Sequence, residues 1–107
     1  MTQITKLIQN ATENAHNHGW YIEWNRTSLN SGVLSVGEAL ALIHSEVSEA
    51  LEEVRDDNKD TFSIEIADVF IRLFHLCGDL NIDIEKAIET KMKKNTTRAK
   101  KHGRKIY

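Results

Sequence analysis

Hydrophobic positions recur every three or four residues along most of the chain, which is the period of a helix that packs one face on a core. Four stretches show this period: residues 2–18, 35–55, 60–80 and 83–103. Ser35 and Glu38 form the Ser-x-x-Glu pattern of a helix start, and Gly19 is a typical helix stop. Residues 19–34 show neither a helical nor a strand period, and a connection of this length is usually functional. The pattern predicts the order helix, loop, helix, helix, helix.

The composition supports a helical fold. The chain contains no proline and five glycines, while Glu, Lys, Ala, Leu and Ile are abundant, which favours long unbroken helices. A length of 107 residues, of which 40% are hydrophobic, suits one compact core. We therefore expect a single all-α domain over residues 1–107. Its protomer should resemble a four-helix bundle with a central antiparallel helical hairpin, and it should oligomerise through helix packing.

Charge is distributed unevenly along the chain. The formal net charge is -2, yet residues 91–107 contain eight of the fourteen Lys and Arg and none of the sixteen Asp and Glu. We interpret most of this basic segment as solvated, because the rest of the chain is acidic and no nucleic-acid-reading motif is present. Nucleic acid is therefore an unlikely partner.

The sequence also bears on the expected compartment. No apolar run is long enough to cross a bilayer, so no membrane partner is expected. The one cysteine, Cys77, has apolar neighbours and is expected to be a buried small hydrophobe. These features predict a soluble protein in a reducing compartment, the cytoplasm.

Two pairs of carboxylates are the strongest chemical signal. Glu46 and Glu49 are three residues apart, as are Glu65 and Asp68, so each pair lies on one face of its helix. Residue 57 is the midpoint between Glu46 and Asp68 and also between Glu49 and Glu65, and it falls in the predicted turn. An antiparallel hairpin would therefore bring the two pairs together.

The third helical stretch gives independent support. Its polar residues follow a 3,4,3,4 spacing and form one narrow stripe: Glu65, Asp68, Arg72, His75 and Asp79. Nearly all other positions of this stretch are apolar, as in a helix buried between neighbours or at a subunit interface.

Four converging carboxylates would repel one another unless cations or raised pKa values relieve them. All-oxygen ligation suits Mg²⁺, with Mn²⁺ as a possible substitute, and no Cys or His joins the cluster at a spacing that would suit zinc. One such pair alone is typical of a solvated acidic face. Two pairs in hairpin register favour a divalent-metal site at Glu46, Glu49, Glu65 and Asp68.

Other residues could complete a site for a phosphorylated ligand. The face of the fourth helix turns from apolar to cationic, and its later part carries Lys91, Asn95 and Arg98, which could hold phosphate oxygens. In the connection, Trp20 and Trp24 could stack a nucleobase. Packing of this connection onto the core is an equally good interpretation.

Three segments resemble the MazG-like all-α nucleoside triphosphate pyrophosphohydrolases: EALALIHSEVSEALEEVR, EIADVFIRLF and KMKKNTTR. The resemblance extends over roughly residues 16–104. It rests on the Glu-x-x-Glu and Glu-x-x-Asp pattern followed by the Lys, Asn and Arg element. It implies hydrolysis of a nucleoside or deoxynucleoside triphosphate to the monophosphate and pyrophosphate, Mg²⁺ on the four carboxylates, and a homodimer or homotetramer. Removal of unwanted nucleotides, or house-cleaning, is the expected role.

The expected mechanism is metal-assisted hydrolysis, with Glu46 or Glu49 as the general base and Lys91, Asn95 and Arg98 positioning the triphosphate. The alternative is a noncatalytic helical module that dimerises or senses a nucleotide.

Overall fold

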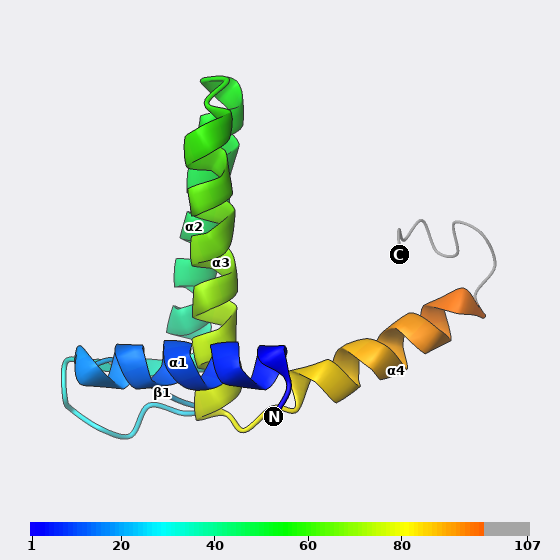
Figure 1. Cartoon of the computed structure of the whole chain (residues 1–107). Helices are drawn as coiled ribbons and strands as arrows, with labels where there is room; N and C mark the ends of the chain where they lie inside the picture. The colour runs from blue at the N-terminus through cyan, green and yellow to red at the C-terminus, as the bar shows by residue number, and fades with distance from the viewer. Residues whose placement is uncertain (98–107) are drawn as a thin grey trace.

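A computed structural model of the chain describes residues 1–97 (Figure 1). Its elements are α1 (Gln3–Asn17), β1 (Tyr21–Glu23), β2 (Val33–Ser35), α2 (Val36–Arg55), α3 (Lys59–Asp79) and α4 (Ile84–Thr96). Four helices carry nearly all of the regular structure, so the predicted all-α class is confirmed. None of the described helices is both long and apolar enough to cross a membrane.

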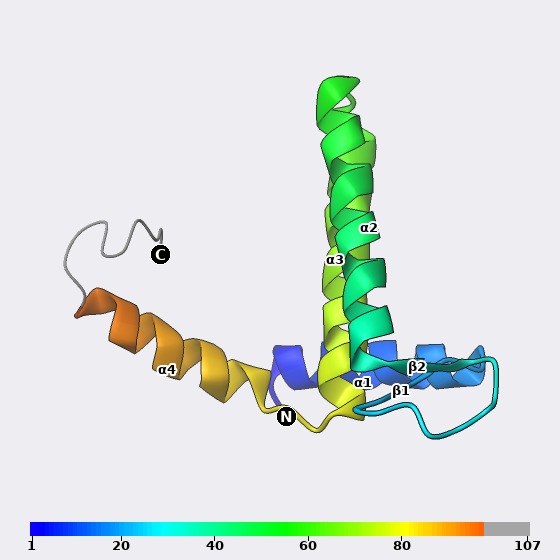
Figure 2. The same cartoon turned by 180° about the vertical axis from the view of Figure 1, so that it is seen from behind.

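The helices α2 and α3 form the predicted central hairpin and run side by side in both views (Figures 1 and 2). The capping box at Ser35 starts α2, because the Ser35 hydroxyl accepts from the Glu38 N–H and the Glu38 carboxylate accepts from the Ser35 N–H. The hairpin turn passes through Asp57 at a positive φ of 54°. Asn58 then caps α3 by accepting a hydrogen bond from the Thr61 N–H at 3.3 Å.

Helix α1 crosses the base of the hairpin and packs on α3 (Figure 1). The approach is close at Gly78, where an added Cβ would overlap the hydroxyl oxygen of Thr12 and lie 3.0 Å from its Cβ. A buried cluster joins the connection to the hairpin and consists of Ile22, Ala39 and Leu76, with partly buried Leu34, Val36, Ile43 and Leu80 packed against it. The close crossing therefore holds α1 against α3, and the buried cluster holds the connection against the hairpin.

The connection between α1 and α2 contains two short strands. Strands β1 and β2 pair in parallel, with Tyr21 opposite Val33 and Glu23 opposite Ser35. The prediction of no regular structure over residues 19–34 is wrong for 21–23, 33 and 34, because strands of three residues are too short to show an alternating pattern. Gly19 does end α1 as predicted, at a φ of 85°.

Helix α4 extends away from the hairpin in both views (Figures 1 and 2). Asp83 caps its start by accepting from the Lys86 N–H at 3.2 Å. The helix runs to Thr96, with Thr97 as its C-cap, and the predicted end at residue 103 lies outside the described residues. The hydroxyls of Thr96 and Thr97 bond to the backbone carbonyls of Lys93 and Lys94, and such local bonds compete with helix continuation.

Candidate metal centre

The hairpin brings three of the four predicted carboxylates together. Glu46 and Glu49 of α2 and Glu65 of α3 each offer an oxygen, and these oxygens lie within 4.8 Å of one another. Glu46 is buried, Glu65 is half-buried and Glu49 is exposed. The cluster therefore runs from the hairpin interior to its surface.

The fourth carboxylate lies one helical turn further along α3. Asp68 is not part of this three-residue cluster, although it lines a cavity that Glu46 also lines. Asp68 follows Glu65 on the polar stripe of α3 and thus lies between the three-carboxylate cluster and the base of the hairpin.

The neighbouring carboxylates of the cluster shift the pKa of Glu49. The pKa of Glu49 is raised, first by a side-chain hydrogen bond with Glu65 and then by the negative charge of Glu46. Glu65 also carries a buried carboxylate oxygen, Oε2, that has no hydrogen-bond partner. Burial of a carboxylate oxygen without a hydrogen-bond partner costs free energy. A divalent cation bound by these oxygens would pair with that oxygen and would also lower the raised pKa of Glu49. The residues present therefore fit a hard divalent cation.

Arg72 is a site residue to which the sequence assigned no role. Its Nε donates a hydrogen bond to Glu46 Oε1 at 2.8 Å, so the most buried carboxylate of the cluster is held by a cation of α3. The signal was present, because Arg72 lies one turn after Asp68 on the polar stripe. Which α2 residue Arg72 bonds to depends on how the two helices are rotated about their axes, and the sequence does not specify this rotation.

A cavity of about 510 Å³ connects the carboxylates to α1 and the connection. It is lined by Ala11, Asn14, Ala15, Trp20, Leu34, Leu42, Glu46, Asp68, Ile71, Arg72 and His75. An aromatic ring and an amide therefore border the same space as two of the carboxylates. Trp24 does not line this cavity and is 69% exposed.

The proposed phosphate-holding residues lie elsewhere in the protomer. Lys91 and Asn95 are on α4, which extends away from the hairpin (Figure 2). Arg98 lies outside the described residues. Asn95 carries a buried side-chain oxygen without a hydrogen-bond partner. One described protomer does not bring α4 to the carboxylates.

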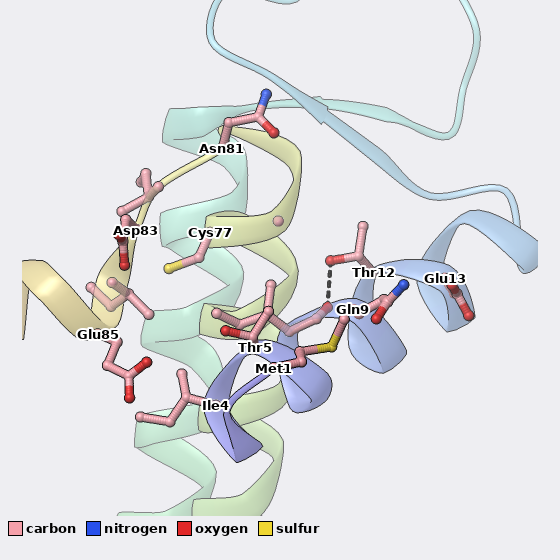
Figure 3. A pocket seen from close by; sticks show the side chains of 14 residues that line it. Met1, Ile4, Thr5, Gln9, Thr12, Glu13, Cys77, Asn81, Asp83 and Glu85 are labelled. Atoms are coloured by element: carbon pink, nitrogen blue, oxygen red, sulfur yellow. Dashed lines mark hydrogen bonds between the residues drawn. The ribbon is translucent and has the colours of Figure 1, made fainter.

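A second cavity, of about 600 Å³, lies between α1 and the turn from α3 to α4, and its lining includes Thr12, Cys77 and Asn81 (Figure 3). It contains neither carboxylate pair and no tryptophan. Cys77 is buried as predicted, and burial raises the pKa of its thiol, which disfavours the nucleophilic thiolate. This cavity offers no comparable chemistry.

Comparison with known families agrees with the geometry of the hairpin. The model of the family described as MazG nucleotide pyrophosphohydrolase domain matches residues 35–103, which is more than half of the chain. The match contains α2, α3 and both carboxylate pairs. No curated protein and no solved structure gave a significant match.

Proposed function

This chain belongs to the MazG nucleotide pyrophosphohydrolase family, and we propose that it hydrolyses nucleoside or deoxynucleoside triphosphates to the monophosphate and pyrophosphate with Mg²⁺. The observation that carries the proposal is the meeting of Glu46, Glu49 and Glu65 on the hairpin, with a carboxylate oxygen of Glu65 left unpaired. Removal of unwanted nucleotides in the cytoplasm is the role that fits this activity.

The ligand set proposed for Mg²⁺ is Glu46, Glu49, Glu65 and Asp68, with Mn²⁺ as a substitute. When bound there, the cation would neutralise phosphate charge and lower the pKa of a bound water. Arg72 holds Glu46 from α3 and thereby fixes the orientation of one ligand.

Glu49 is the better candidate for the general base. A proton acceptor must be reachable by water and must bind a proton readily in the transition state. Glu49 is exposed, whereas Glu46 is buried and is held by Arg72. Glu46 therefore suits a ligand role and Glu49 suits proton transfer from the attacking water.

The cavity beside the carboxylates suits the nucleoside part of the substrate. Trp20 offers a ring face for stacking a base, and Asn14 offers an amide that both donates and accepts hydrogen bonds. The contribution of Trp24 remains a prediction from sequence that the cavity lining does not support.

Binding of the triphosphate through Lys91, Asn95 and Arg98 requires α4 to reach a hairpin. A second copy of the chain is the proposed source, in a homodimer or homotetramer. Large apolar side chains are exposed on the hairpin and on α4, including Val54, Ile64, Phe70 and Met92. Extensive apolar exposure of this kind marks protein interfaces.

The test is a screen of common and damaged nucleoside triphosphates with the protein and Mg²⁺, with monophosphate and pyrophosphate measured separately. We expect equal amounts of the two products from at least one substrate. A noncatalytic nucleotide-sensing or dimerisation module would instead bind a nucleotide without turnover. Inactivity toward every nucleotide would overturn the proposal.

A further inference from the structure

A second set of possible metal ligands lies at the base of the hairpin. His16 of α1 approaches one carboxylate oxygen of Asp79 with its Nε2 at 2.6 Å, and His75 of α3 approaches the other oxygen with its Nε2 at 2.8 Å. The side chains of His75 and Asp79 are largely buried, and that of His16 is 35% exposed. Two imidazoles from different helices therefore converge on one buried carboxylate.

We propose that His16, His75 and Asp79 bind a transition-metal dication such as Zn²⁺, at a site distinct from the carboxylates of the hairpin. Two imidazole nitrogens and one carboxylate oxygen suit zinc and its neighbours in the first transition row, whereas Mg²⁺ prefers oxygen ligands alone. The two sites thus differ in the class of metal that they select.

The spacing of the ligands supports this proposal. His75 and Asp79 are four residues apart on α3, so both side chains lie on one face of the helix. Metal–ligand distances of about 2.0–2.2 Å in a tetrahedral site place neighbouring ligand atoms roughly 3.4 Å apart. The three ligand atoms here lie within 4.8 Å of one another, and the two hydrogen-bonded N–O pairs lie at 2.6 and 2.8 Å. The two N–O distances are shorter than the required value by less than about 1 Å, so small side-chain rotations make room for a metal.

The surroundings hold the ligands in place before a metal binds. The ring of His16 stacks on Tyr21 with centroids 4.4 Å apart, and the Ile22 N–H donates to Asp79 Oδ2 at 2.8 Å. The hydrogen bonds of Asp79 thus join α1, α3 and β1 without a metal. On metal binding, the hydrogen bonds from His16 and His75 to Asp79 would be replaced by bonds from each Nε2 to the metal. Each ring would then carry its proton on Nδ1, which leaves the Nε2 lone pair for the metal.

Such a site would fix one wall of the cavity that leads to the carboxylates. His75 itself lines this cavity, and α1 and the residue before β1 supply Asn14 and Trp20 to it. Binding of Zn²⁺ would therefore stabilise the wall proposed to meet the nucleoside, without involving Glu46 or Glu49.

The test is calorimetric titration of the untagged chain with Zn²⁺ in millimolar Mg²⁺, which occupies oxygen-only sites. We expect one Zn²⁺ per chain in the wild type, at least about tenfold weaker binding in His16→Gln and in Asp79→Asn, and unchanged binding in the matched control His44→Gln. His44 is an exposed histidine of α2 outside the cluster. Circular dichroism verifies that each variant keeps its helical content.

A measurement on the wild type alone guards against variants that misfold. Side-chain ¹⁵N spectra should show the Nε2 resonances of His16 and His75 shifting on addition of one equivalent of Zn²⁺, with His44 unchanged. Absence of Zn²⁺ binding, or shifts confined to the other histidines, would overturn the proposal. Equal affinity in folded His16→Gln and in the control would overturn it as well.

Discussion

Replacement of Gly78 by alanine tests the close crossing of α1 over α3. An added Cβ would overlap Thr12 Oγ1 and would lie 3.0 Å from Thr12 Cβ and 3.2 Å from its Cγ2. Rotation of the Thr12 side chain cannot relieve the contact with Cβ, and it would break the hydrogen bond from Oγ1 to the Ile8 carbonyl. The two helices must therefore separate.

The size of the effect follows from two opposing contributions. Overpacking of this kind costs about 1–3 kcal/mol, and three close atoms place Gly78→Ala in the upper half of that range. The better helix propensity of alanine offsets about 1 kcal/mol of this cost. We expect a net loss of about 1–2 kcal/mol, which lowers the Tm by about 5 to 15 °C in a protein of this size.

Thermal unfolding followed by circular dichroism measures this change. Gly37→Ala is the matched control, because its Cβ would meet only Ser35 Oγ at 3.9 Å within α2, and it should keep or raise the Tm. The double variant Thr12→Ala/Gly78→Ala should recover part of the loss. A Tm of Gly78→Ala at or above that of the wild type would refute the close crossing.

Three further predictions concern the site and its surroundings. Because the pKa of Glu49 is raised in the folded state, the contribution of Glu49 to stability is present at acid pH and is lost as the pH rises through that pKa. In thermal melts with EDTA, the Tm of Glu49→Gln should match that of the wild type near pH 4 and exceed it at pH 7. Equal Tm values at pH 7 would contradict this. In steady-state kinetics, Trp20→Ala should raise KM about tenfold through lost base stacking, and this increase should exceed that caused by Trp24→Ala. A larger increase in KM for Trp24→Ala would place the base elsewhere. Phe70→Glu should reduce the oligomer in sedimentation velocity, because Phe70 is 53% exposed on the hairpin; an unchanged sedimentation coefficient would exclude this face from the interface.

The hairpin could be predicted from sequence because its information is local. The capping box at Ser35, the polar turn around Asp57 and the period of two long helices each act within a few residues. Together they set the register that brings Glu46, Glu49 and Glu65 into one cluster. The carboxylates could therefore be placed without knowledge of any other element.

The remaining arrangement depends on contacts that are distant in sequence. His16 and Asp79 are 63 residues apart, and nothing local indicates that α1 crosses α3 at Gly78. The direction of α4 is not indicated by its own sequence either, and in the structure α4 extends away from the hairpin with Ile88 and Met92 exposed. The sequence proposes Lys91 and Asn95 as phosphate-holding residues but does not indicate which chain's hairpin they would reach.

Turnover of the best triphosphate substrate by Glu49→Gln, beside the control Glu52→Gln, tests the central claim most directly. Glu52 is an exposed residue of the same helix, ion-paired with Arg55 at 2.7 Å and outside the cluster. We predict that pyrophosphate release in Mg²⁺ falls at least about a hundredfold in Glu49→Gln and is unchanged in Glu52→Gln, with helical content retained in both. Wild-type rates in Glu49→Gln would contradict the assignment of the hairpin carboxylates as the catalytic centre.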